Sequence, residues 1–230
     1  MVHIRVEHLS HRYGEGPLSR LVLDDVNVDA DQTRIGVVGH NGSGKSTFVR
    51  MLDALITPTQ GRVLVDGIDV AAEPATVRRM TGFLFTDPDS QIIMPTVAED
   101  VAFGLRRSGL TREEISDRVA AMLEHYGLSS HRDHPAHLLS GGQKQLLALA
   151  SVLITSPRLL IMDEPTTLLD LRNARRFARL VAELDQTVVL ATHHLDLLTD
   201  FDRVLVFDAG RLVADDAPAP ALAHYRSLMD

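Results

Sequence analysis

The chain has 230 residues, which suits one domain or one domain with a sizeable insert. Hydrophobic residues make up 45% and charged residues 23%, a balance that is typical of a globular protein and excludes a disordered chain. The formal net charge of -8 argues against non-specific nucleic-acid binding, so we expect no nucleic-acid partner. The absence of cysteine excludes disulfides and thiolate metal sites.

The chain shows neither a signal peptide nor a membrane span in its hydrophobicity pattern. Residues 1–5 lack an apolar core, and no apolar run approaches the roughly 20 residues that cross a bilayer. The most apolar stretch, residues 146–154, is short and fits a buried helix. If this protein works at a membrane, we expect another chain to hold it there.

Strands, helices and then an alternation of both follow one another along the chain. Short apolar or alternating segments predict strands at 2–6, 20–28, 34–38, 62–67, 82–85, 159–162, 187–191 and 204–207. Helical spacing predicts helices at 46–55, 97–107, 112–126, 143–154, 173–184 and 218–229. The alternation after residue 157 predicts an α/β fold with parallel strands and crossover helices. We therefore expect a core of about 1–85 and 157–230 with a helical insert of about 90–155.

A glycine-rich loop between a predicted buried strand and a predicted helix matches the P-loop pattern G-x-x-x-x-G-K-[ST]. Glycines let the backbone turn tightly, so that several N–H groups meet phosphate oxygens at the positive end of a helix. The lysine brings a charge to the outer phosphates, and the serine offers its hydroxyl to Mg²⁺. The pattern predicts a bound nucleotide with Mg²⁺, held by Gly39, His40, Asn41, Gly42, Ser43, Gly44, Lys45, Ser46 and Thr47.

A second strand, predicted at 159–162, ends in two carboxylates. Asp163 fits the Mg²⁺-supporting carboxylate of P-loop enzymes, alongside Ser46. Glu164 follows on the other side of the pleat, where it is placed to orient or deprotonate the attacking water. The competing interpretation is two acids in a solvated turn, but the apolar strand before them and the P-loop upstream favour a catalytic pair.

The segment Leu139-Ser140-Gly141-Gly142-Gln143 matches the LSGGQ signature of the ATP-binding-cassette family, which the chain resembles over nearly its whole length. Ser140 and the glycines open a predicted helix and form a second anion site. The resemblance implies a P-loop cassette with a mainly parallel core sheet, an N-terminal antiparallel β subdomain and a helical insert that carries the signature. It also implies an ATP-dependent homodimer, in which the signature of one copy covers the ATP of the other through Ser140, Gly141, Gly142 and Gln143.

Other family landmarks occur in the same order as in the family. Tyr13 matches the aromatic residue that stacks on adenine, and residues 168–170 resemble the loop that crosses the dimer interface. His193 and His194 match the switch-histidine region. His193 follows the predicted strand directly, so we choose it for the contact with the terminal phosphate, although His194 stands where the family usually has Asp.

The chain departs from the family at Thr86, where a glutamine normally contacts Mg²⁺ and signals to the membrane subunit. A threonine hydroxyl reaches less far than a glutamine amide. Three explanations stay open: water fills the gap, nearby Gln91 substitutes, or the contact is dispensable.

The segment after Thr86 is similar to the ATPases of energy-coupling-factor importers. Four acids lie there within a short span, and they form either a solvated charged turn or a docking surface for basic residues of a partner. The resemblance favours docking, by Asp87, Asp89, Glu99 and Asp100. It also implies a transmembrane scaffold (T) subunit, a substrate-capture (S) subunit and a peripheral location at the cytoplasmic face of the membrane.

The short C-terminus and residues 165–173 look like the ATPase of dedicated biotin importers. We therefore predict an ATP-hydrolysing subunit that energises a vitamin importer, with biotin as the cargo. The alternatives are a cobalt, nickel or other vitamin importer of the same group, a soluble ATPase of the family, and a nucleotide-binding module with little turnover.

Overall fold

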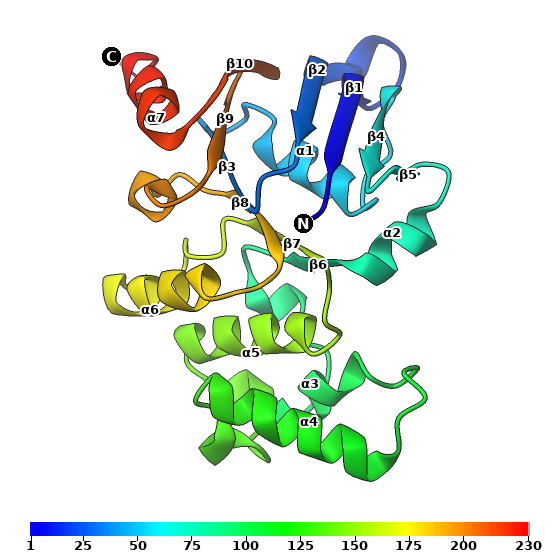
Figure 1. Cartoon of the computed structure of the whole chain (residues 1–230), viewed down its shortest axis with the longest axis vertical. Coiled ribbons are helices and arrows are strands. Elements are labelled where there is room, and N and C mark those ends of the chain that lie inside the picture. The colour runs from blue at the N-terminus through cyan, green and yellow to red at the C-terminus, as the bar shows by residue number, and fades with distance from the viewer. Residues whose placement is uncertain (230) are drawn as a thin grey trace. The chain divides into compact units, whose positions relative to one another are not determined.

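The computed structural model describes residues 1–229, which form two compact units (Figure 1). Unit 1 contains residues 1–82, 158–164 and 185 onward, and unit 2 contains residues 83–157 and 165–184. Residues 165–184 belong to unit 2, whereas the sequence predicts them as part of the core. Local contacts give the reason: the guanidinium of Arg176 donates to the carbonyl of Tyr126 at 2.9 Å, and the Asn173 side chain lies against Gly142.

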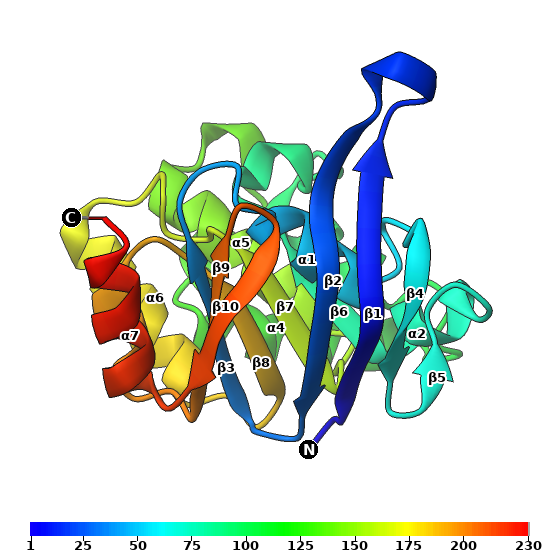
Figure 2. The same ribbon diagram turned by 90° about the horizontal axis from the view of Figure 1, so that it is seen from above.

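An antiparallel sheet in unit 1 has the order β2-β1-β4-β5. Its strands are β1 (Ile4–Tyr13), β2 (Arg20–Ala30), β4 (Gln60–Val65) and β5 (Ile68–Asp69), with the 3-10 turn η1 (Gly16–Leu18) between the first two. Figure 2 shows β1 and β2 side by side, with the turn that joins them projecting at one end. β1 is longer than the predicted 2–6 because register shifts after Val6, beside the positive φ of His8, interrupt the alternating pattern.

A second sheet has the order β10-β9-β3-β8-β7-β6. Its strands are β3 (Arg34–Gly39), β6 (Thr81–Leu84), β7 (Leu159–Asp163), β8 (Thr187–Ala191), β9 (Arg203–Asp208) and β10 (Arg211–Asp216). β3 pairs in parallel with both β8 and β9, and β7 pairs in parallel with β8. Among the described strand pairs of this sheet, β10 runs antiparallel to β9, and its largely exposed, acidic sequence lacks the apolar run that predicts a buried strand. The parallel arrangement brings the carboxyl ends of β3, β7 and β8 to one edge, where α/β sheets bind ligands.

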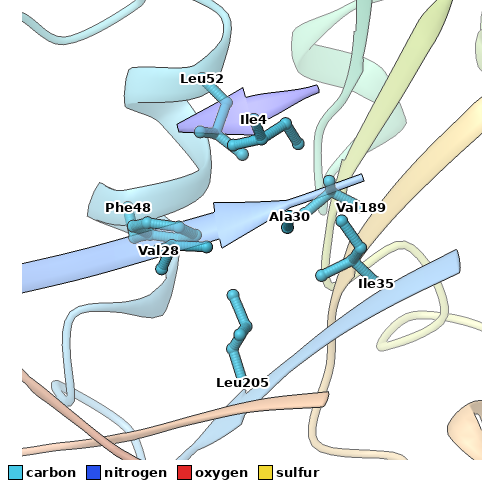
Figure 3. A pocket seen from close by; sticks show the side chains of 8 residues that line it. All are labelled: Ile4, Val28, Ala30, Ile35, Phe48, Leu52, Val189 and Leu205. Carbon is cyan, nitrogen blue, oxygen red and sulfur yellow. The ribbon is translucent and has the colours of Figure 1, made fainter. Parts of the chain in front are cut away.

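Helices of unit 1 cover these sheets. They are α1 (Lys45–Leu52), α2 (Pro74–Met80), the 3-10 segment η5 (Leu195–Leu198) and α7 (Pro218–Ser227). Phe48 and Leu52 of α1 point toward apolar side chains from both sheets (Figure 3). The apolar residues that meet there are Ile4, Val28, Ala30, Ile35, Phe48, Leu52, Val189 and Leu205. This shared core fixes α1, and with it the loop before α1, against both sheets.

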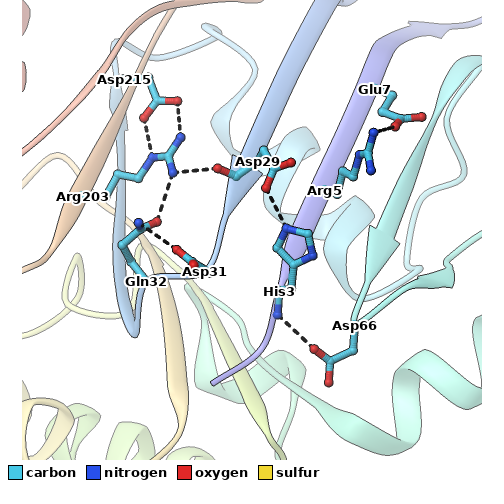
Figure 4. A network of polar contacts seen from close by, with 9 residues as sticks. All are labelled: His3, Arg5, Glu7, Asp29, Asp31, Gln32, Asp66, Arg203 and Asp215. Carbon is cyan, nitrogen blue, oxygen red and sulfur yellow. Dashed lines mark hydrogen bonds and ion pairs between the residues drawn. The ribbon is translucent and has the colours of Figure 1, made fainter.

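Polar contacts around Arg203 join strands of unit 1 (Figure 4). The Arg203 guanidinium forms an ion pair with Asp215 of β10 at 2.5 Å. It also donates to the carbonyl of Asp29 at 2.7 Å and to the side chain of Gln32 at 3.0 Å. A single residue of β9 thus links β10 with the end of β2.

Unit 2 is helical. Its segments are η2 (Pro88–Ser90), α3 (Val97–Phe103), α4 (Arg112–His125), η3 (Ser129–His131), η4 (Ala136–Leu138), α5 (Gly141–Leu153) and α6 (Leu171–Ala182). Capping boxes begin three of these helices, at Thr96, Thr111 and Ser140. α3 ends at Phe103, earlier than the predicted residue 107, because the next N–H groups, of Leu105 and Arg106, donate to carbonyls three residues back and form turns.

Candidate functional site

The glycine-rich loop of unit 1 leads from β3 into α1. A Cβ on Gly39 would lie 2.3 Å from the carbonyl oxygen of Phe207 and 2.4 Å from the hydroxyl of Ser43, so a larger residue does not fit. Gly44 takes the left-handed conformation (φ +103°) at the N-cap of α1. The loop therefore turns directly in front of an eight-residue helix, an arrangement that binds anions through backbone N–H groups.

Lys45 lies inside this turn and is only 6% exposed. Its Nζ donates to the carbonyl oxygens of Gly39 at 2.7 Å and of His40 at 3.1 Å. Burial lowers the pKa of the Lys45 ammonium, and the carboxylates of Glu164 and Asp163 oppose that shift. The loop thus holds the Lys45 ammonium among backbone carbonyls and amides. Phosphate oxygens bound there would meet both the positive charge and the backbone N–H donors.

Asp163, at the end of β7, is 1% exposed and meets two side chains of α1. The Ser46 hydroxyl donates to its Oδ1 at 2.8 Å, and the Arg50 guanidinium pairs with its Oδ2 at 3.0 Å. Hydroxyl and carboxylate oxygens are ligands that Mg²⁺ prefers, and Mg²⁺ commonly takes one or two from the protein while phosphates and water supply the rest. Ser46 and Asp163 fit that donor set, and within residues 1–229 no group of three or more His, Cys, Asp or Glu side chains is arranged to hold a metal ion.

Glu164 has a positive φ of +53°, a strained conformation for a residue with a side chain. Its N–H donates to the carbonyl of Ala191 at 2.9 Å, so the chain turns at the edge of β8. One carboxylate oxygen accepts from the backbone N–H of His193 at 3.2 Å and lies 2.7 Å from its Nδ1. The strained turn thus brings the carboxylate and the imidazole together beside the glycine-rich loop, an arrangement that can hold a water molecule.

His194 is placed differently from His193. Its N–H donates to the hydroxyl of Thr192 at 3.0 Å, and its ring lies edge-on to that of His193, with centroids 4.2 Å apart. His193 pairs with Glu164. The contact of His193 with the terminal phosphate, which the sequence favours, stays a prediction.

Tyr13 ends β1 and is 44% exposed. Its hydroxyl lies 3.4 Å from that of Thr47 in α1, and its ring packs edge-on against His11, with centroids 4.7 Å apart. A half-exposed ring that is fixed beside the start of α1 is suited to stacking on a nucleotide base. Sequence reasoning missed His11, and it also missed Arg50, although Arg50 lies one helical turn after Ser46 and so shares its face.

The signature motif lies in unit 2, at the N-terminus of α5. The Gln143 side chain accepts from the Ser140 N–H at 2.9 Å, and the Ser140 hydroxyl accepts from the Gln143 N–H at 3.4 Å. The Gln143 amide also lies 3.1 Å from the ring of His131. A Cβ on Gly142 would come within 2.8 Å of Asn173, which accounts for a glycine there, as Gly141 opens the helix.

Thr86 follows β6 in a short bend of unit 2. The Gln91 side chain folds back onto that strand: its oxygen accepts from Phe85 N–H at 3.3 Å, and its nitrogen donates to the Phe83 carbonyl at 3.1 Å. Both ends of the amide are thus engaged. Substitution of Gln91 for the usual glutamine stays a prediction that would require these bonds to open.

The four acids after Thr86 differ in exposure. Asp87, Asp89 and Glu99 are exposed, whereas Asp100 is 3% exposed. Both carboxylate oxygens of Asp100 accept hydrogen bonds from groups of unit 2. The expectation that Asp100 contributes to an exposed docking surface is therefore wrong. A carboxylate buried to this extent is retained because amide and hydroxyl donors satisfy it.

Known proteins resemble the chain in sequence and in structure. Residues 23–167 match the family model described as "ABC transporter". A putative ABC transporter ATP-binding protein of Deinococcus radiodurans is 54% identical, over 98% of each chain. The biotin transport ATP-binding protein BioM of Rhizobium etli is 47% identical, over 91% of this chain and 93% of the relative. The energy-coupling factor transporter ATP-binding protein EcfA1 of Caldanaerobacter subterraneus subsp. tengcongensis is 40% identical, over 94% of this chain and 80% of the relative.

Two solved structures extend the comparison. The cbiO1 protein of Clostridium perfringens is described as part of the ABC transporter complex cbiONQ. It has a TM-score of 0.84 at 31% identity, and the match spans 92% of its length. A dimeric ATP-binding cassette in a post-hydrolysis state with ADP and phosphate has a TM-score of 0.82 at 26% identity, with 98% covered. These structures cover 98% and 94% of this chain. Within residues 1–229, no helix has the length and apolar character needed to cross a membrane. The chain belongs to the ABC transporter family, as a cassette that binds and hydrolyses ATP.

Proposed function

We propose that this chain is the ATPase subunit of an energy-coupling-factor importer, that two copies of it close on ATP, and that the imported cargo is biotin. The observation that carries the proposal is the similarity to BioM over almost the full length of both chains. The similarity to EcfA1 supports the same transporter group independently of the cargo.

The glycine-rich loop binds the triphosphate. Its backbone amides and the Lys45 ammonium meet the phosphate oxygens, while Tyr13 stacks on the base. Ser46 and Asp163 would hold Mg²⁺, which would supply positive charge to neutralise the phosphates. Arg50 keeps one oxygen of Asp163 in place, so the carboxylate presents the other toward Ser46.

Glu164 orients the attacking water and accepts its proton. The carboxylate has a fixed direction, because its strained backbone and two contacts with His193 leave it little freedom. His193 in turn presents its ring toward the terminal phosphate. The preorganised amides and Lys45 stabilise the charge that develops on the transferred phosphoryl group.

Two copies of the chain sandwich two nucleotides, with the signature residues 140–143 of one copy over the ATP of the other. The capped N-terminus of α5 supports this role, because it offers backbone N–H groups and the Ser140 hydroxyl to an anion. The similarity to a cassette described as dimeric with ADP and phosphate supports the same arrangement.

A transmembrane scaffold (T) subunit and a substrate-capture (S) subunit complete the importer, and this chain lies on the cytoplasmic face of the membrane. Asp87 and Glu99 are the exposed acids that face basic residues of the scaffold. Closure on ATP and reopening after hydrolysis drive the membrane subunits through this contact.

An affinity purification of the tagged chain from native membranes, followed by mass spectrometry, tests the proposal. We expect one scaffold membrane protein and one small capture protein, and the purified complex should take up labelled biotin into vesicles when ATP is present. Recovery of soluble partners alone would overturn the importer. Recovery of the complex with uptake of another vitamin or a metal ion would overturn biotin only.

A further inference from the structure

The loop that follows β6 and the signature helix α5 are connected at two points within unit 2. Lys144 follows Gln143 of the signature directly, and its Nζ meets both oxygens of Asp89 at 2.7 and 2.9 Å. The Lys144 side chain is 16% exposed, whereas that of Asp89 is 61% exposed. The lysine therefore lies mostly within the unit and reaches out to a carboxylate at the surface of the loop.

The second point lies further along α5. Asp100 accepts from the backbone N–H groups of Ile93 at 2.9 Å and Met94 at 3.0 Å through one oxygen. Its other oxygen accepts from the Ser151 hydroxyl at 2.8 Å. The buried carboxylate thus ties the end of the loop to α5.

The two anchor positions on α5 lie on the same face. Lys144 and Ser151 are seven residues apart, which is about two helical turns and about 10 Å along the axis. The segments that supply their partners, η2 and α3, both pack on α5. The loop between 86 and 94 is therefore fixed along one face of the helix whose first residues are the signature.

We propose that Asp89 is a positioning residue for the signature: its ion pair with Lys144, together with the Asp100–Ser151 bond, fixes Ser140–Gln143 relative to the loop after Thr86. The inference rests on the proposed function, in which the signature of one copy binds the ATP of the other. It assigns Asp89 a partner within its own chain, in place of the docking role that the sequence suggested. A displacement of the loop would then move the N-terminus of α5 with it.

The test compares ATP-dependent dimerisation of the full chain by analytical ultracentrifugation, in an E164Q background that slows hydrolysis. Asp89→Asn removes the charge, and we expect it to weaken dimerisation about three- to five-fold. Affinity of the monomer for a fluorescent ATP analogue, measured at chain concentrations too low for dimers, should stay unchanged, because the glycine-rich loop belongs to unit 1. This separation of dimerisation from nucleotide affinity is a readout that general loss of stability would not produce.

Two further variants serve as controls. Asp117→Asn removes the charge of an exposed acid in α4 and should dimerise like the parent. The double variant D89N/K144M removes the unpaired lysine along with its partner and should recover to within about two-fold of the parent, since an ion pair can be replaced by apolar groups with little loss.

Three outcomes overturn the inference: undiminished dimerisation of D89N, an equal loss in D117N, or a double variant as weak as D89N. If the E164Q parent itself shows no ATP-dependent dimer, the proposed signature contact between copies is wrong. This inference, which depends on that contact, is then wrong as well. The two failures are distinguishable because only the second affects the parent.

Discussion

In unit 1 the candidate catalytic groups come from two strand ends and one helix, and contacts between these elements hold them. Asp163 of β7 meets Ser46 and Arg50 of α1, and Glu164 meets His193 after β8. In unit 2 Ser140 and Gln143 cap their own helix, and contacts with His131, Asn173 and the Asp89–Lys144 ion pair place that helix start within the unit. The comparison shows that the groups of unit 1 are brought together by elements distant in sequence, whereas the backbone of the signature is set by a cap within four residues.

The largest expected effect concerns the contact between Glu164 and His193 in unit 1. Glu164→Gln keeps the shape of the side chain and removes its capacity to accept a proton, so hydrolysis should fall at least about 100-fold. ATP affinity should be retained. Phosphate release and binding of a fluorescent ATP analogue measure the two quantities. Normal turnover of the variant would show that another group activates the water.

The next effect separates the capping role of the signature from its binding role. Ser140→Ala and Thr111→Ala each remove the N-cap of a helix in unit 2, and each should lower the free energy of unfolding by about 1 kcal/mol. Only Ser140→Ala should also lower ATPase activity, by roughly ten-fold or more, because its hydroxyl is expected on the phosphates of the other copy. Urea unfolding and phosphate release check both parts. Equal loss of activity in the two variants would reduce Ser140 to a structural cap.

A buried acid in unit 1 predicts a pH effect on stability. Burial raises the pKa of Asp53 from 3.8 to about 6, against the opposing hydrogen bond from Thr81 and the charge of Arg78. The folded state therefore binds this proton more tightly than the unfolded state. The contribution of Asp53 to stability is present below about pH 4 and is lost as the pH rises through about 6.

The size of the pH effect on the free energy of unfolding follows from this pKa shift. The variant Asp53→Asn has no carboxyl group at this position and so lacks the effect. The free energy of unfolding of the wild type, minus that of the variant, should fall by roughly 2–3 kcal/mol between pH 4 and pH 7. Urea unfolding at several pH values measures the difference. Asp117→Asn is the exposed control and should show no such trend, and a flat difference for Asp53→Asn would contradict the shift.

The last prediction concerns the effect of the polar contacts around Arg203 in unit 1 on stability. Arg203→Ala removes an ion pair and two hydrogen bonds, and should cost about 1–2 kcal/mol of unfolding free energy. Arg5→Ala removes the exposed pair with Glu7 and should leave the Tm unchanged. Thermal unfolding of both variants checks the contrast in Figure 4. Equal shifts would mean that the Arg203 contacts contribute no more than a surface pair.

The sequence by itself determined the elements that local rules control. The glycine-rich loop and the signature occupy short stretches whose residue types dictate their backbone, and β8 has the predicted bounds. The order of these motifs also sufficed for the family, because their combination is specific.

Only the tertiary structure decided which side chains meet. Four acids looked equivalent after Thr86, yet packing buries Asp100 under amide donors, joins Asp89 to Lys144 and leaves Asp87 and Glu99 exposed. Arg50 reaches Asp163, 113 residues away in the chain, because β7 ends beside α1. Spacing along a chain specifies which groups share a helix face or a strand end, whereas burial and pairing depend on elements that are distant in sequence and meet only in the fold.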